Sequence, residues 1–178
     1  MRVQSGVIVN SPPNRPVTYP VPRRPIPYWE EKSLAQMSAA EWESLCDGCG
    51  RCCLNKLEDW DTGAVALTRV ACRLLDGETC RCRDYANRKR LVPECIELTS
   101  DKVDDLAWLP ATCAYRLIAD GRDLEPWHPL VSGSPLTVHE AGVSVQGWTI
   151  SESDVPEDEW ENHLIAWEMI DPDAGLRE

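Results

Sequence analysis

The stretch Cys46-Asp-Gly-Cys49-Gly-Arg-Cys52-Cys53 places four cysteines within eight residues of a 178-residue chain. Five further cysteines follow, so that all nine lie between positions 46 and 113: Cys72, Cys80, Cys82, Cys95 and Cys113. Thiols that serve only as core filler would be scattered along the chain. Thiols gathered in one segment, with two-residue gaps, indicate a common centre, and the usual centre is a thiophilic metal ion.

The spacing within the cluster has a chemical meaning. Two cysteines separated by two residues can turn their sulfurs toward one ion, and glycines beside them leave backbone N–H groups free to point at sulfur. Cys52 and Cys53 are adjacent and their side chains diverge, so they favour two neighbouring ions, or one ion plus a packing or bridging role. Cys80 and Cys82 project to the same face in an extended segment. Asp59 and Asp61 are candidate oxygen ligands, although a solvated turn is the simpler interpretation.

Apart from Cys113, which lies on a helical pattern, eight thiols are candidate metal ligands: Cys46, Cys49, Cys52, Cys53, Cys72, Cys80, Cys82 and Cys95. Eight thiolates could form two tetrahedral sites, or one iron–sulfur cluster with spare ligands. The bacterial ferredoxin pattern matches only through its first three cysteines, and no second CxxC pair completes a zinc ribbon. Cys113 and His128 are additional candidates, for which core packing and a hydrogen-bonded loop position are the alternatives.

The net charge and the lack of membrane-spanning or secretory segments restrict the possible partners and the expected compartment. The formal net charge is −12, from 18 basic and 30 acidic residues, which disfavours binding to nucleic acid or to anionic lipid. No apolar run is long enough to span a membrane, and the N-terminus has no secretory h-region. We therefore expect a cytoplasmic protein without nucleic-acid or membrane partners, whose thiols stay reduced.

The chain divides into three parts. Residues 1–27 are rich in proline and predict a flexible arm, residues 28–170 predict a single cysteine-rich metal-binding domain, and residues 171–178 predict a loose tail. The expected fold class is α+β: helix-rich, with an irregular cysteine-rich core nucleated by metal and a small C-terminal β-hairpin. The arm and an acidic C-terminal helix are the two candidate surfaces for a protein partner.

Four local patterns carry the expected secondary structure. A short helix is expected over 28–37, and Ser38 and Glu41 predict a capping box that starts a second helix leading to Cys46. Residues 113–119 predict a helix that Gly121 stops. Residues 143–150 alternate with period two and predict a strand, with 136–139 as its hairpin partner. Residues 157–169 predict an acidic amphipathic helix, and residues 71–95 predict irregular structure.

Several motifs together resemble a known family. They are Trp42-Glu-Ser-Leu-Cys-Asp-Gly-Cys-Gly-Arg-Cys-Cys53, Val70-Ala-Cys-Arg-Leu-Leu75, Thr79-Cys-Arg-Cys-Arg-Asp-Tyr85, Pro93-Glu-Cys95, Trp108-Leu-Pro-Ala-Thr-Cys-Ala-Tyr-Arg-Leu117 and Trp127-His-Pro-Leu130. The chain resembles the bacterial YcgN-type proteins of the YkgJ-like CxxCxxCC group, described as zinc- or iron-chelating. The resemblance runs from about 28 to about 160 and implies metal chelation through the eight candidate cysteines.

Three functions remain open. The first is a cytoplasmic metal-binding protein that holds zinc or iron by a cysteine thiolate cluster and is not itself an enzyme. The second is an iron–sulfur-dependent redox or protein-modification enzyme, such as a methyl-transfer accessory, which related domains attached to flagellin lysine methylases imply. The third is an interaction adaptor in which metal only nucleates the fold. The sequence contains no Ser-His-Asp arrangement, P-loop, HExxH or dinucleotide loop, which favours the first.

Overall fold

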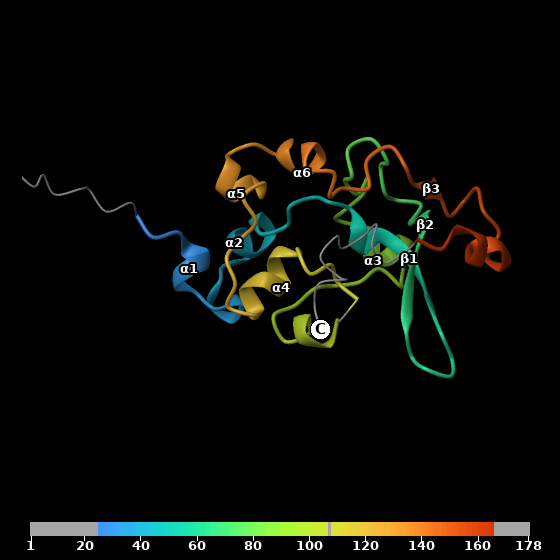
Figure 1. Ribbon diagram of the computed structural model, residues 1–178, viewed down its shortest axis with the longest axis horizontal. Helices are drawn as coiled ribbons and strands as arrows, with labels where there is room; N and C mark the ends of the chain where they lie inside the picture. Colours follow the sequence, from blue (N-terminus) through green and yellow to red (C-terminus); the bar gives the residue numbers. More distant parts are fainter. Residues whose placement is uncertain (1–24, 107, 166–178) are drawn as a thin grey trace, which may run out of the picture.

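The structure is a computed structural model that describes residues 25–106 and 108–165. Most of the expected arm, all of the expected tail and the last part of the expected acidic helix lie outside these ranges. The α-helices are short: α1 (Tyr28–Glu31), α2 (Ala39–Ser44), α3 (Arg88–Leu91), α4 (Ala114–Ala119), α5 (Pro129–Ser132) and α6 (Thr137–Glu140). The 3-10 turns are η1 (Leu34–Gln36), η2 (Arg51–Cys53), η3 (Val103–Asp105) and η4 (Glu157–His163). Figure 1 shows that long irregular connections separate these short elements.

The helix that leads to the cysteine cluster begins at the expected capping box. The Ser38 hydroxyl accepts a hydrogen bond from the Glu41 N–H at 3.3 Å, and the Glu41 carboxylate accepts from the Ser38 N–H at 2.8 Å. These two bonds satisfy backbone donors that the first turn of α2 would otherwise leave free. The single helix expected over 28–37 is replaced by α1 and η1, because Lys32 and Ser33 between them are extended.

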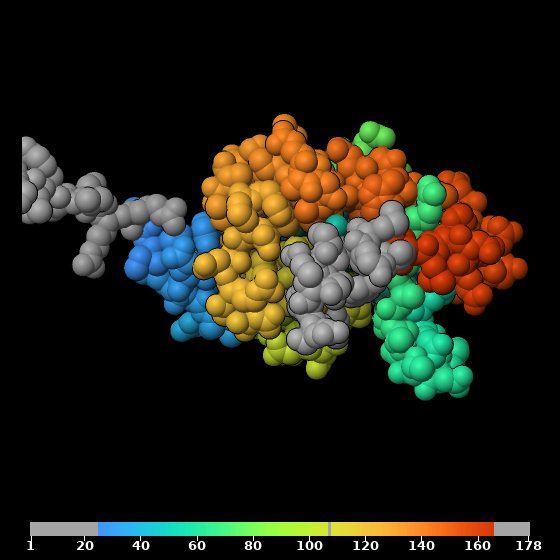
Figure 2. All heavy atoms as spheres, in the orientation of Figure 1, coloured from blue at the N-terminus to red at the C-terminus, as the bar shows by residue number. Residues whose placement is uncertain are grey.

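A small mixed sheet lies at the other end of the molecule (Figure 1). Strand β1 (Leu54–Glu58) pairs antiparallel with β2 (Val65–Ala71), and β2 pairs parallel with β3 (Ile150–Ser151). In Figure 2 the tip of the β1–β2 hairpin stands away from the body of the molecule. The Asp59 Oδ1 atom accepts hydrogen bonds from the backbone N–H groups of Asp61 and Thr62, which orders this tip.

The C-terminal β-hairpin expected from residues 136–139 and 143–150 is wrong. Residues 137–140 form α6 instead, and only Ile150 of the second segment belongs to a strand. The Val145 N–H donates to the Cys49 carbonyl at 2.8 Å rather than to a hairpin partner, and Gly147 has a φ of 76°, which interrupts an extended strand. The alternation of Val143 and Val145 therefore reflects an irregular segment that inserts Val145 into the core, where it is fully buried.

Two other expectations differ in outcome. The helix over 113–119 is confirmed as α4, and the Gly121 N–H bonds to the Ile118 carbonyl at 3.1 Å with a φ of 67° at Gly121. Of the acidic α-helix expected over 157–169, the described part forms the 3-10 turn η4 up to His163, and Leu164 and Ile165 belong to no helix. Residues 71–95 are irregular, as expected, except for the end of β2 and the single turn of α3.

The buried side chains form two clusters rather than one. The first lies under the sheet and consists of Leu54, Leu67, Ala71, Leu75, Cys80 and Val145. The second lies between the helices and consists of Leu34, Leu45, Val103, Ala114, Tyr115 and Leu124. The segment from Cys46 to Cys53 joins Leu45 of the second cluster to Leu54 of the first. The cysteine motif is therefore the shortest of the chain segments that join the two cores.

Candidate metal centre

A cavity of about 740 Å³ lies between the two cores. Six cysteines line it: Cys46, Cys52, Cys53, Cys72, Cys82 and Cys95. Its other walls include the aromatic rings of Trp42, Tyr115 and Trp160, together with aliphatic side chains. Trp42 and Tyr115 pack against each other with ring centroids 4.6 Å apart. Thiols that are up to 49 positions apart in the sequence (Cys46 to Cys95) thus share one hollow.

Hydrogen bonds to backbone carbonyls hold the Cys46–Cys53 loop at both ends and in the middle. The Leu45 carbonyl, just before Cys46, accepts from the His128 ring at 3.0 Å. The Cys49 carbonyl accepts from the Val145 N–H at 2.8 Å, and the Cys53 carbonyl accepts from the Cys72 N–H at 2.9 Å. Three distant segments therefore fix the loop, so its position follows from the whole fold rather than from its own sequence.

Gly50 is required by the shape of the loop. Its φ is 76°, which favours glycine, and a Cβ atom there would lie 2.7 Å from Val145 Cγ2 and 3.3 Å from Cys80 Cβ. The close approach lets the loop lie directly on the first core. A side chain at this position would push the cysteine segment away from that core.

Cys52, Cys53 and Lys56 form one electrostatic unit. The interaction between the two adjacent thiols lowers the pKa of Cys52, the Lys56 charge lowers it further, and the same interaction raises the pKa of Cys53. The Lys56 ammonium donates to the Cys52 carbonyl at 3.0 Å and to the Leu54 carbonyl at 2.6 Å, and it lies 4.1 Å from the centroid of the Trp108 ring. A thiolate is the form of cysteine that binds metal, and a neighbouring ammonium offsets its charge.

Lys56 is a residue that sequence reasoning missed. Burial lowers its pKa, whereas Cys52 is the largest of the neighbouring thiols that raise it. The only sequence signal is its position three residues after Cys53 at the start of a strand, where the alternation of side chains returns Lys56 to the face of Leu54. Nothing in the spacing of the cysteines predicts a cation at that place.

Most of the remaining thiols are held in their neutral form by their surroundings. Burial is the main cause that raises the pKa of Cys49, Cys72, Cys95 and Cys113, in the last case to about 12. The charges on Glu152, Cys95 and Cys82, in that order, raise the pKa of Cys72 further, and the charge on Cys82 raises that of Cys95. Metal binding at these positions would therefore release protons, because the ligand is the thiolate.

Three sequence-predicted residues and His128 need separate comment, because none of them lines the thiol cavity. Cys49 is half-buried on the loop, and its N–H donates to Asp47 Oδ1 at 2.9 Å. Cys80 is buried in the first core with a φ of 54°, so it does not share a face with Cys82. Cys113 is the residue before α4 and packs against the second core.

His128 has both ring nitrogens occupied. Nε2 lies 3.0 Å from the Leu45 carbonyl oxygen, and Nδ1 accepts from the Leu130 N–H at 3.1 Å. The side chain is 1 % exposed. This pattern requires the tautomer with its proton on Nε2, and it leaves no lone pair for a metal ion. His128 acts as the N-cap of α5 and as an anchor of the cysteine loop.

The cavity does not contain a preformed coordination sphere. Over residues 25–106 and 108–165, no three Cys, His, Asp or Glu side chains converge closely enough to hold a metal ion in the positions that they adopt. Asp59, which the sequence offers as an oxygen ligand, lies at the exposed hairpin tip and caps the turn there. The cysteines line one cavity, but their side chains are not arranged as the ligands of a bound ion.

The cavity is lined by more acidic than basic side chains. Glu94, Glu97 and Glu157 line it in addition to Glu152, which pairs with Arg73 at 2.9 Å. Tyr85 donates to Glu43 at 2.9 Å, and the Arg88 guanidinium lies 3.8 Å from the centroid of the Tyr85 ring. An excess of acidic side chains in a thiol-lined hollow favours the approach of cations over anions.

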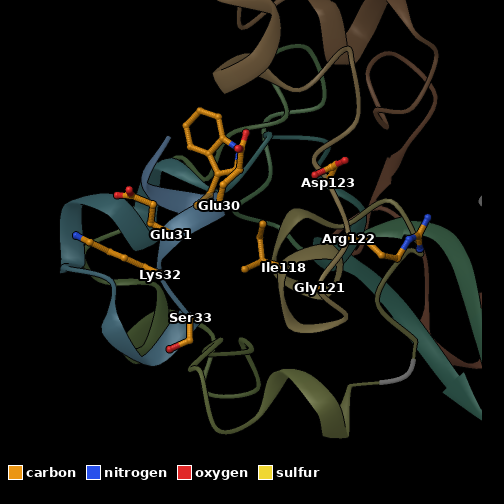
Figure 3. A pocket seen from close by; sticks show the side chains of 9 residues that line it. Glu30, Glu31, Lys32, Ser33, Ile118, Gly121, Arg122 and Asp123 are labelled. Atoms are coloured by element: carbon orange, nitrogen blue, oxygen red, sulfur yellow. The ribbon is translucent and has the colours of Figure 1, made fainter. Parts of the chain in front are cut away.

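A second hollow of about 430 Å³ has a different character. It lies between α1 with the residues after it and the C-terminal end of α4, where Figure 3 shows Lys32 and Ser33 on one side and Ile118 and Gly121 on the other. Its lining among the described residues includes neither a cysteine nor a histidine, so it offers no soft donor to a thiophilic ion.

Comparison with known proteins agrees with this class of site. Residues 45–114, which contain all nine cysteines, match the CxxCxxCC family model, described as "Putative zinc- or iron-chelating domain". Over these residues the chain is similar to that class of domain, which supports metal binding. None of the helices in the described part of the chain is long and apolar enough to cross a membrane.

The relatives define the family over most of the chain. A UPF0260 protein of Allorhizobium ampelinum is 61 % identical over 143 residues, which is 80 % of this chain and 90 % of the relative. UPF0260 proteins of Sinorhizobium medicae and Rhizobium etli are 59 % and 58 % identical, each over 81 % of this chain and over 93 % and 91 % of the relative. The chain belongs to the UPF0260 family. No solved structure matches it.

Proposed function

We propose that the protein binds zinc or iron through thiolates of the cavity between the two cores. One observation carries the proposal: six cysteines from separate parts of the chain line a single hollow, beside the half-buried side chain of Lys56. Zinc and iron both accept thiolate ligands, and an ammonium close to the sulfurs offsets the negative charge that such a site accumulates. The likeness to the YcgN-type proteins of the YkgJ-like group supports the same function.

The proposed ligands are the six cavity thiols and Cys49, which lies on the same loop: Cys46, Cys49, Cys52, Cys53, Cys72, Cys82 and Cys95. Because these side chains do not converge as they stand, binding requires them to rotate toward the ion within the hollow. Cys80 is supported by sequence spacing alone, since its side chain lies in the first core. Metal bound between the cores would join them, which supports a metal-nucleated domain.

An iron–sulfur cluster is the second candidate, and the size of the hollow favours it. A volume of about 740 Å³ exceeds what one or two bare ions need, and the apolar walls would shield a cluster from water. A cluster would supply electron transfer, or would serve a protein-modification reaction as an accessory. Either form of the site needs reduced cysteines, and a reducing, cytoplasmic compartment is part of the proposal.

The test is a zinc titration of the reduced, metal-free full-length protein against a chromophoric chelator. Cys52→Ser and Cys72→Ser should each lower the number of bound ions or their affinity, because each removes a thiol of the cavity. Cys80→Ser is the matched control, and it should keep the stoichiometry even if it lowers stability. Equal binding by wild type, Cys52→Ser and Cys72→Ser would contradict the proposal.

A further inference from the structure

Asp47 carries a buried carboxylate oxygen without a hydrogen-bond partner in the part of the chain that the structure describes. The residue is 5 % exposed and lies between Cys46 and Cys49. Its Oδ1 atom accepts from the Cys49 N–H at 2.9 Å, which closes a local turn. Its Oδ2 atom is buried and has no hydrogen-bond partner among the described residues. Burial of such an atom is costly unless another group compensates it, and a bound cation would do so.

The surroundings of Asp47 are thiols. Burial is the main cause that raises the pKa of Cys49 and of Cys46; the Asp47 charge raises the pKa of Cys49 next, and it raises that of Cys46 after the charge on Cys52. It also acts on Cys52 in the same direction. The Arg81 guanidinium lies against Gly48 on the same loop, but it gives Asp47 Oδ2 no hydrogen bond. A cation close to this oxygen would compensate both the carboxylate and the thiolates around it.

We propose that Asp47 Oδ2 is an oxygen ligand of an ion held by the Cys46, Cys49 and Cys52 thiolates. This inference rests on the proposed function and adds to it a mixed sulfur and oxygen donor set. The hydrogen bond from the Cys49 N–H to Oδ1 fixes the carboxylate on the loop. Oδ2 therefore stays in the buried region, and ion binding costs the Asp47 side chain little further conformational entropy.

The donor set has a consequence for metal preference. Carboxylate oxygen suits harder ions, whereas a site made of thiolates alone favours soft ones such as cadmium. A site with Asp47 should therefore prefer zinc or ferrous iron, relative to cadmium, more strongly than the same site without the carboxylate. The residue sets which ion the thiols select as well as how tightly they bind.

The variant Asp47→Asn separates ligation from the turn. Asparagine keeps a side-chain oxygen that can accept the Cys49 N–H, and it replaces only the second oxygen with an amide nitrogen. We expect the zinc affinity of the reduced, metal-free full-length protein to fall by roughly 10- to 100-fold, the size of effect typical of groups that support a metal site. The cadmium affinity should fall less, so the zinc-to-cadmium selectivity should decrease.

Asp59→Asn is the matched control. Asp59 also accepts backbone N–H groups in a tight turn, but it lies at the exposed hairpin tip. Its variant should bind zinc and cadmium as the wild type does. Asp47→Asn with wild-type zinc affinity and wild-type selectivity would overturn the inference and leave the thiolate site intact. A wild-type protein that binds neither zinc nor iron would overturn both.

X-ray absorption at the zinc edge keeps the inference testable if Asp47→Asn does not fold. The zinc-loaded wild type should show oxygen at roughly 2.0–2.2 Å in addition to sulfur at roughly 2.3 Å. Sulfur scattering alone would overturn the inference. Where the variant does fold, an oxygen shell unchanged by Asp47→Asn would assign that shell to water and would also overturn it.

Discussion

The ring Nε2 of His128 lies 3.0 Å from the carbonyl oxygen of Leu45, the residue that precedes the first cysteine of the cluster. The two residues are 83 positions apart, and both are buried. The bond joins the start of α5 to the start of the cysteine loop. A residue that the sequence offers as a metal ligand thus supports the ligand-bearing loop through its backbone.

Removal of this anchor should destabilise the protein. His128→Ala leaves the Leu45 carbonyl and the Leu130 N–H without their partners, at roughly 1–3 kcal/mol for each buried group. His128→Asn should lose less, because asparagine is a good N-cap and can still accept from Leu130, although it is too short to reach Leu45. Urea unfolding of the metal-free forms measures both losses, and a midpoint for His128→Ala equal to wild type would contradict this role.

Gly50→Ala should be one of the most damaging small substitutions in the loop. The left-handed φ costs about 1–2 kcal/mol for a residue with a Cβ, and the contact of 2.7 Å with Val145 adds an overpacking cost of roughly 1–3 kcal/mol. Gly63→Ala is the control, since Gly63 has a φ of 70° but open space around it. Similar losses of unfolding free energy in the two variants would show that the loop does not need the close approach.

The capping box predicts a pH dependence. The Lys32 ammonium and the Ser38 N–H both donate to Glu41 and lower its pKa from 4.5 to about 2. Because the folded-state pKa lies below the unfolded one, Glu41 stabilises the fold above about pH 4.5, and this contribution is lost as the pH falls toward about 2. The stability difference between wild type and Glu41→Gln should therefore shrink over that interval in acid titrations followed by circular dichroism. A constant difference would exclude this linkage.

Metal removal should lower the thermal stability of the whole domain. An ion that binds only the folded state stabilises it by about 2.7 kcal/mol at one hundred times its dissociation constant, and a site between the two cores would couple them. A chelator should then lower the melting temperature, and Cys46→Ser should melt lower than wild type in the presence of zinc. Superimposable melting curves with and without chelator would mean that metal does not support the fold.

The sequence predicted the local features that depend on neighbouring residues. The Ser38–Glu41 capping box and the stop of α4 at Gly121 are examples, because each is settled by contacts within a few residues. The C-terminal hairpin failed for the opposite reason. Val145 bonds to Cys49, nearly a hundred positions away, and no local period can reveal that bond.

The same difference between local and long-range contacts explains which parts of the candidate site could be predicted. The clustering of cysteines correctly predicted that several thiols lie close together. Spacing alone could not show that Cys82 lines the cavity whereas Cys80 packs in the first core. The chain direction reverses around the left-handed Cys80, and an extended segment was the wrong assumption. Asp47 could have been found from sequence as an Asx-turn residue between two cysteines, whereas Lys56 needed the strand to place it.

The metal content of the protein as isolated tests the proposed metal site most directly. The full-length protein, purified without oxygen, is analysed for bound metals by mass spectrometry and for its visible absorption spectrum. We predict stoichiometric zinc without visible colour, or iron with acid-labile sulfide and a broad band near ~400 nm. A correctly folded, reduced protein that contains neither metal, and that takes up neither when it is supplied, would contradict the proposed metal site.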